Sequence, residues 1–478
     1  MAKDFDVVRI LPAGSRPGAT TAPTLLTSPR FVRLGLGTLL LTAAGWVDVL
    51  ANGAPTPLAA LVGVALLTSG VWQLAHAVLL QQESAGSSEE KPARRLGRLT
   101  LYAALAISSA ITLALVVTLA LGSSGTTRLY DSDAAAFNHY NADLVVHGRN
   151  PYVADADFWD ALRRFPSVGA TPLRAGRYAA SQLGPSLGQV VADAHSEATT
   201  PLERGPEFAP ASLHSYPALS FLVFVPGVWA GLPTTFWTSL LFLIAFLTAA
   251  FWRAPRRLWL PLGVVALANS LLAFWTLRGS FEVIALLPAL LAWRTLDRRM
   301  LSPALLGIAC AVKQVVWPLV PLYLVVIWRQ EGPRAALLRI PIVALGFLIP
   351  NLPFALASPT AWASSLLLPV TLPIFPSGVG LIALVRAGIL PLWQPWVYSV
   401  LELSALAALV IWIARCRVVP PAGVVLVVGL MPLAFAWRSI FAYFMVLPVL
   451  AIAAVLPLLK GETAAPIGGR APEPAAAE

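Results

Sequence analysis

The sequence predicts an all-α protein, a polytopic bundle of transmembrane helices with one large loop outside the lipid. Hydrophobic residues make up 58% of the chain and charged residues only 12%, whereas soluble domains carry about 25% charged residues. The apolar residues also form long blocks that do not alternate with polar ones. Because backbone amides and carbonyls inside lipid must be bonded within a helix or a closed barrel, such blocks indicate helices.

The first three blocks have the length of membrane spans. Phe31–Leu50, Pro57–Leu80 and Leu99–Leu121 each approach the ~20 residues that cross a hydrocarbon core of about 30 Å. More blocks follow from Leu258 almost to the C-terminus. We expect about twelve spans when the basic connectors are considered and up to about fourteen from hydropathy. Met1–Arg30 is polar and lacks the apolar core of a signal peptide.

Basic residues predict which helix ends face the cytoplasm. Arg30 and Arg33 precede the first block, and the connector after the second block runs from Lys91 to Arg98. Because cytoplasmic connectors are rich in Lys and Arg, both should lie inside, which places the loop Gly122–His214 outside. The protein is thus expected in the cell membrane with both termini in the cytoplasm. Later cytoplasmic turns are predicted at Arg253–Arg257, Arg294–Arg299, Arg329–Arg334 and Arg415–Arg417.

These features divide the chain into four parts. Residues 1–30 form a cytoplasmic tail, and residues 31–98 form an additional transmembrane hairpin with a basic cytoplasmic loop. Residues 99–459 form the main membrane module, which includes the extracytoplasmic loop 122–214. The Ala/Pro/Gly-rich composition of residues 460–478 predicts a disordered cytoplasmic tail.

Several later spans are interrupted. Prolines break the first half of Tyr216–Trp252, which is expected to be interfacial or re-entrant, and Ser358–Trp393 poses the same ambiguity. Leu301–Val312 and Val315–Trp328 are too short for ordinary spans and are separated only by Lys313-Gln314. A lysine at membrane depth is costly unless it faces a cavity, where it is usually functional. Lys313 is therefore a candidate site residue.

Charge and cysteine usage exclude other classes. The net charge of +10 does not indicate nucleic-acid binding, because many basic residues flank apolar blocks, as the positive-inside rule predicts. Cys310 and Cys416 lie in or beside apolar blocks and are expected to be unpaired and inert.

The loop Gly122–His214 carries most of the usable chemistry, with ten of the 23 acidic residues. Asp131 and Asp133 follow the third span, where a carboxylate could take a proton from an incoming hydroxyl. They could equally complement the dipole of a helix start. Four of the five histidines also lie in the loop; they lack metal-ligand spacing and are expected at the surface. They are His139, His147, His195 and His214.

The loop resembles that of a known superfamily. An acid after an early span, then Tyr140 on a helix, then Gly148-Arg149-Asn150-Pro151-Tyr152, resembles the first extracytoplasmic loop of GT-C glycosyltransferases. It is most similar to bacterial polyprenyl-phosphate-sugar-dependent enzymes of the glycosyltransferase family 87 type. Weaker similarities extend the resemblance over Leu99–Leu459, whereas the N-terminal hairpin and Arg174–Pro210 have no counterpart. The similarities are Ser215–Leu219, Lys313-Gln314, and Arg438-Ser439 with Tyr443.

This resemblance implies transfer of a sugar, with inversion, from a polyprenyl-phosphate donor to an extracytoplasmic hydroxyl on a lipid or glycan. Asp133 would be the general base and Asp131 a supporting carboxylate. Lys313, Arg278 and Arg438 would bind the donor phosphate; the two arginines could instead be interfacial anchors, and Glu282 could merely pair with Arg278. No cofactor is implied, and a divalent metal stays open. The expected substrate-binding residues are Tyr140, Asn150, Tyr152, Gln314, Glu282 and Tyr443.

Two other functions stay open. A secondary transporter would also account for broken helices and Lys313, although no internal repeat is visible and so long an acidic loop is unusual for a carrier. A polysaccharide polymerase or ligase would share a lipid-linked substrate but would depend on arginines and a histidine rather than on Asp133. Membrane lipids are expected partners in all three cases.

Overall fold

A computed structural model of the chain describes residues 28–51, 55–79, 92–122, 130, 132–153, 158–167, 170–185, 188–190, 192–193, 196, 206 and 214–464. Within these residues the protein is a bundle of helices with one two-stranded parallel sheet. In the part of the chain that the structure describes, six helices are long and apolar enough to cross a membrane, or seven if one bent pair counts as a single span. The chain is therefore an α-helical membrane protein. The larger count of about twelve spans stays a prediction.

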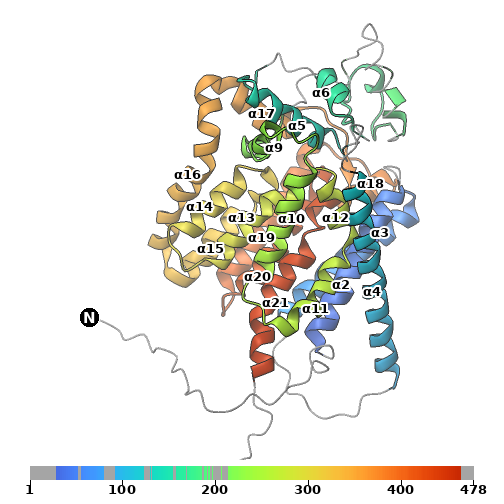
Figure 1. Cartoon of the computed structure of the whole chain (residues 1–478), viewed down its shortest axis with the longest axis vertical. Coiled ribbons are helices and arrows are strands. Elements are labelled where there is room, and N and C mark those ends of the chain that lie inside the picture. The colour runs from blue at the N-terminus through green and yellow to red at the C-terminus, as the bar shows by residue number, and fades with distance from the viewer. Residues whose placement is uncertain are drawn as a thin grey trace, which may run out of the picture.

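The three N-terminal spans are confirmed as helices. They are α2 (Pro29–Ala51), α3 (Pro57–Leu79) and α4 (Pro92–Leu121). Figure 1 shows that the Pro92 end of α4 lies at the opposite end of the molecule from the loop helices α5 (Asp133–Val146) and α6 (Phe158–Arg164). A short 3-10 helix, η2 (Gly176–Tyr178), follows in the loop.

The proline-rich segments form short helices, as expected for interrupted spans. Tyr216–Trp252 contains α8 (Leu219–Leu222), α9 (Val225–Trp229) and α10 (Phe236–Ala250). Ser358–Trp393 contains α17 (Pro359–Thr371), β1 (Ser377–Gly378) and α18 (Leu381–Arg386).

The pair α11 (Arg256–Leu267) and α12 (Ser270–Leu277) is bent by 70°. Asn269 lies at the bend. Its side chain accepts a hydrogen bond from the amide of Leu272 (3.3 Å) and donates one to the carbonyl of Met445 (2.5 Å). Since an interrupted helix leaves backbone groups unpaired, this side chain stabilises the break.

The break at Lys313 is confirmed. It separates α14 (Leu301–Cys310) from α15 (Leu319–Glu331), with only η6 (Gln314–Val316) between them. Helices α13 (Glu282–Arg294) and α16 (Pro333–Ala357) pack against α14. A Cβ at Gly307 would lie 2.1 Å from the carbonyl oxygen of Val343, so α14 and α16 meet backbone to backbone. This close packing fixes the helix that leads to Lys313.

The C-terminal part completes the bundle. Its elements are α19 (Pro395–Arg415), α20 (Ala422–Val428), η7 (Met431–Phe435), β2 (Arg438–Ser439), η8 (Phe441–Tyr443) and α21 (Leu447–Ala464). Helix α21 ends at Ala464, within the first residues of the segment predicted to be a disordered tail.

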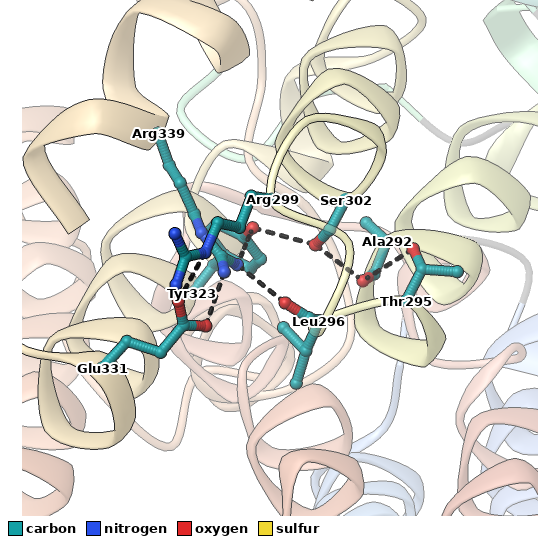
Figure 2. A network of polar contacts seen from close by, with 8 residues as sticks. All are labelled: Ala292, Thr295, Leu296, Arg299, Ser302, Tyr323, Glu331 and Arg339. Carbon is teal, nitrogen blue, oxygen red and sulfur yellow. Dashed lines mark hydrogen bonds and ion pairs between the residues drawn. The ribbon is translucent and has the colours of Figure 1, made fainter. Parts of the chain in front are cut away.

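A buried polar network joins α13, α14, α15 and α16 (Figure 2). The guanidinium of Arg339 donates to the Glu331 carboxylate (2.5 Å), the Tyr323 hydroxyl (2.8 Å) and the Leu296 carbonyl (3.0 Å). The Tyr323 hydroxyl contacts Ser302 (2.8 Å), whose own hydroxyl donates to a carbonyl of α13. Tyr323 therefore donates to Ser302, because each hydroxyl has one proton. The network locks the turn between α15 and α16 onto α13.

Candidate functional site

Asp133 begins helix α5 and is almost completely buried. Its carboxylate accepts hydrogen bonds from the backbone amides of Ala134 (2.8 Å) and Thr171 (2.5 Å). Burial raises the pKa of this carboxyl group above its usual value; the hydrogen bonds of Thr171, the charge of Arg438 and the amide of Ala134 act in the opposite direction. Asp133 is thus a buried carboxylate with a raised pKa near a cation, and a strongly perturbed pKa marks it as a candidate site residue.

Short backbone pairings bring Arg438 near Asp133. The amide of Arg174 donates to the carbonyl of Pro373 (2.7 Å), and Leu173 forms a bridge with Ile374. These pairings join the segment after Thr171 to residues 373–374, directly before β1. Strand β1 in turn pairs in parallel with β2, which places Ser377 beside Arg438.

This pairing requires a glycine. Gly378 has φ of +108°, and a Cβ there would lie 2.1 Å from the carbonyl oxygen of Ser439. Any side chain would therefore force β1 and β2 apart. The close approach of the two strands fixes the backbone of Arg438.

Lys313 lies in extended backbone at the break between α14 and α15 and forms a buried ion pair with Glu282. The Ser280 hydroxyl donates to the same carboxylate. The alternative in which Glu282 merely pairs with Arg278 is not what the structure shows: the turn before α13 directs the carboxylate to Lys313.

Aromatic rings surround the Lys313 ammonium group. It lies 4.1 Å from the ring centroid of Phe281, 5.4 Å from that of Tyr443 and 5.5 Å from that of Tyr216. Ring faces attract a cation most strongly where water is excluded. The ion pair and the rings together compensate for the burial of this charge.

A glycine turn joins the ion pair to α5. At Gly279, φ is +101°, and a Cβ would lie 2.8 Å from the Cβ of Ala135 and 2.9 Å from the Tyr130 ring. The turn before Glu282 therefore packs directly on the first turn of α5, beside Asp133. Arg278 precedes this turn, and its guanidinium lies over the Phe274 ring at 4.8 Å.

Tyr443 lies between the Lys313–Glu282 ion pair and Arg438. Besides its contact with Lys313, its hydroxyl interacts electrostatically with Arg438 and Glu282. The structure thus brings together Asp133, Arg438, Lys313, Glu282 and Tyr443, which the sequence had singled out individually. We call these five residues the five-residue site.

Three other predicted substrate-binding residues hold the loop in place. The Tyr140 hydroxyl donates to Asp160 (3.0 Å), and the Tyr152 hydroxyl donates to the carbonyl of Tyr216 (3.0 Å). The Asn150 side chain accepts from the amide of Tyr152 (3.0 Å). Both tyrosines are buried, at 1% and 4% exposure. The Gly-x-Asn-Pro-Tyr motif therefore anchors α5 in this structure; its role in substrate binding stays a prediction.

Gln314 ties the broken span to the loop. Its side-chain amide donates to the carbonyl of Ser215 (2.6 Å), whereas its carbonyl oxygen is buried without a partner. Nε of Arg438 and the hydroxyl of Ser439 are likewise buried without partners. Because buried polar groups are normally bonded, these atoms are available to a ligand or to water.

The prediction of surface histidines is wrong for His139 and His214, which are both 3% exposed. The Thr235 amide donates to the Tyr130 hydroxyl (3.2 Å), and this hydroxyl is also hydrogen-bonded to Nδ1 of His139 (2.5 Å). Burial lowers the pKa of His139 to about 4 and that of His214 to about 3, so both are neutral near pH 7. His147 is exposed, as predicted.

Sequence reasoning missed Thr171, Gly279 and Ser280. A glycine and a serine directly before Glu282 were the available signal for a turn. Asp131 and His195, which the sequence singled out, lie outside the described residues. Among the residues that are described, no group of three or more His, Cys, Asp or Glu side chains could hold a metal ion.

Comparison with family models, curated proteins and solved structures finds no match to this chain.

Proposed function

We propose that this protein is a membrane glycosyltransferase. It moves a sugar from a polyprenyl-phosphate-sugar donor to a hydroxyl of a lipid or glycan acceptor outside the cytoplasm, with inversion. The observation that carries the proposal is the buried carboxylate of Asp133 within electrostatic reach of Arg438 and beside the turn that leads to Glu282 and Lys313.

The cations suit an anionic phosphate to different degrees. Lys313 is already paired with Glu282, whereas Nε of Arg438 is buried without a partner. Arg438 is therefore the main phosphate ligand in this proposal, since a guanidinium can bind phosphate through two parallel hydrogen bonds. Lys313 supplies a second positive charge that the phosphate shares with Glu282. Arg278 lies on the same side of the bundle and is the third candidate.

The reaction needs one base. The acceptor oxygen attacks the anomeric carbon while its proton passes to the Asp133 carboxylate. The bond between that carbon and the phosphate oxygen breaks, and the polyprenyl phosphate leaves as an anion that the cations stabilise. No carboxylic acid is needed to protonate the leaving group, unlike in glycoside hydrolysis. Asp131 is proposed as a supporting carboxylate.

The test is direct. Purified protein in lipid nanodiscs is incubated with a panel of labelled polyprenyl-phosphate sugars and a membrane-lipid acceptor extract, and the products are identified. Transfer by the native chain, lost in Asp133→Asn, supports the proposal. Unaltered consumption of donor by the Asp133→Asn variant would exclude Asp133 as the base, and no transfer from any donor would reject the function.

A secondary transporter is the second candidate, since one observation favours it. A buried ion pair at a broken helix, Glu282 with Lys313, is an arrangement that transporters use to couple ion movement to substrate. In proteoliposomes, a transporter accumulates labelled sugar or sugar lipid unchanged, whereas a transferase releases a new product. The variant Asp133→Asn distinguishes a polysaccharide polymerase or ligase from the proposed transferase, because the polymerase or ligase would keep its activity.

A further inference from the structure

The additional N-terminal hairpin is packed against the segments that carry the five-residue site. A Cβ at Gly45 of α2 would lie 2.3 Å from Leu271 and 2.4 Å from the ring of Phe441. Phe441 begins η8, which ends at Tyr443. Because helix α2 approaches this closely only with glycine at position 45, the hairpin and η8 share one packed interface.

Further ties from α2 reach the neighbouring segments. The indole of Trp46 donates to the Ser270 hydroxyl (3.1 Å) at the start of α12. Asp48 interacts electrostatically with Arg386 of α18, the helix that follows β1. Helix α2 therefore packs against η8, which follows β2, and interacts electrostatically with α18, which follows β1.

The contacted segments are joined to one another. Asn269 at the start of α12 donates to the carbonyl of Met445, directly after η8. Trp275 of α12 packs edge to face on Phe441, with ring centroids 5.8 Å apart. Displacement of Phe441 would thus move Tyr443 relative to Lys313, and would be transmitted toward Arg438.

We infer that the N-terminal hairpin supports binding of the donor phosphate at the five-residue site, and that Gly45 acts as a positioning residue for Arg438 and Tyr443. The inference rests on the proposed function. It predicts that substitution at Gly45 weakens binding of the donor phosphate although Gly45 is not one of the five residues of the site. A hairpin that served only as a membrane anchor would have no such effect.

The test compares Gly45→Ala with Gly63→Ala. At Gly63 of α3, the nearest heavy atom to an added Cβ is 3.5 Å away, which is ordinary contact. Binding of polyprenyl phosphate is measured in nanodiscs, which requires no turnover. We expect Gly45→Ala to raise the Kd about tenfold. A displacement of about 1 Å can cost up to ~10²-fold, so this effect is within the expected range. Gly63→Ala should bind polyprenyl phosphate like the native chain.

Transfer kinetics add a second readout. In Gly45→Ala the donor KM should rise more than the acceptor KM, and the acid limb of kcat/KM should move to higher pH as Arg438 shifts away from Asp133. If Gly45→Ala does not fold, Trp46→Phe should show the same changes more weakly. Native-like donor binding in the folded variant overturns the inference. Failure of the native chain itself to bind polyprenyl phosphate instead rejects the proposed function.

Discussion

Two carboxylate–cation pairs lie at opposite ends of helix α13; the first is buried, and the second has a buried arginine but a partly exposed glutamate. Glu282 begins the helix and pairs with Lys313, whereas Leu296, just beyond its end, accepts a hydrogen bond from Arg339, the partner of Glu331. In the second pair, Arg339 also reaches a tyrosine and a backbone carbonyl. Within the described group Arg339, Glu331, Tyr323 and Ser302, no buried side-chain nitrogen or oxygen lacks a partner, although Nε1 of Trp293, which packs on Tyr323, is buried without one.

The surroundings of the first pair differ. Aromatic rings enclose Lys313, and the polar atoms without partners lie on the adjoining residues Gln314, Arg438 and Ser439. A network in which all buried groups are bonded serves to hold helices together, whereas unpaired polar atoms beside a buried charge indicate a place where another molecule binds. We therefore interpret the Arg339 network as a structural clamp and the five-residue site as the place of chemistry.

The largest expected effect is on cysteine labelling, because the end of the bundle with the five-residue site and the end with the clamp are predicted to lie on opposite sides of the membrane. His147, directly after α5, and Arg298, near the clamp, have side chains 64% and 72% exposed. With Cys310 and Cys416 replaced by alanine, His147→Cys should react with an impermeant maleimide only from outside, and Arg298→Cys only from inside. Labelling of both from one side would contradict the topology on which the proposed function depends.

The second largest expected effect is the fall in turnover when the Asp133 carboxylate is removed. Asp133→Asn cannot accept a proton, so turnover should fall by the ~10²–10⁴ typical of a general base, with donor binding retained. Initial rates with labelled donor check this. The matched control is Asp143→Asn, on the same helix, whose carboxylate pairs with the partly exposed Arg164. Equal losses in both variants would point to damage of α5 rather than to catalysis.

A double-mutant comparison separates the two ion pairs. Lys313→Met should destabilise the protein by about 3–5 kcal/mol because it leaves the buried Glu282 charged and unpaired, and Lys313→Met/Glu282→Met should recover most of this loss. Arg339→Met/Glu331→Met should recover less, since Tyr323 and the Leu296 carbonyl also lose their donor. Thermal unfolding in nanodiscs compares each double variant with its single variant, Lys313→Met or Arg339→Met. Full recovery in both pairs would mean that the clamp is no more than an ion pair.

The KM for the polyprenyl-phosphate-sugar donor should depend on Arg438. Loss of a charge-assisted contact is worth about 1.5–3 kcal/mol, so Arg438→Gln should raise the donor KM by about ten- to hundredfold. Arg298→Gln, an exposed arginine at the other end, is the control. Native-like donor dependence in Arg438→Gln, Lys313→Gln and Arg278→Gln together would reduce the three cations to structural anchors.

The smallest expected effect is a shift in pH dependence. Asp133 must be ionised to act as a base, so kcat/KM should fall as the pH drops through its pKa, which burial raises. Arg438 lowers this pKa, and its removal should therefore raise the pKa and move the acid limb to higher pH. Rate profiles of the native chain and Arg438→Gln, measured at equal donor saturation, test the sign. A shift to lower pH would show that Arg438 does not act on Asp133.

Local sequence features determined much of this protein. Hydropathy over about 20 residues predicted α2, α3 and α4, and a lysine within apolar residues predicted the break between α14 and α15. The acidic residue at the start of α5 was also evident, because Asp favours the first turn of a helix. Each of these properties depends on neighbours along the chain.

Only the tertiary structure decided which distant groups meet. The pairing of Glu282 with Lys313 depends on a glycine turn and a helix break, and the approach of Arg438 to Asp133 depends on the bridge between Leu173 and Ile374. The burial of His139, its bond to Tyr130 and the contact of Gly45 with Phe441 are likewise products of packing. Hydropathy reports how apolar a segment is, but partners far apart in the chain are chosen by the shapes of the surfaces that pack together.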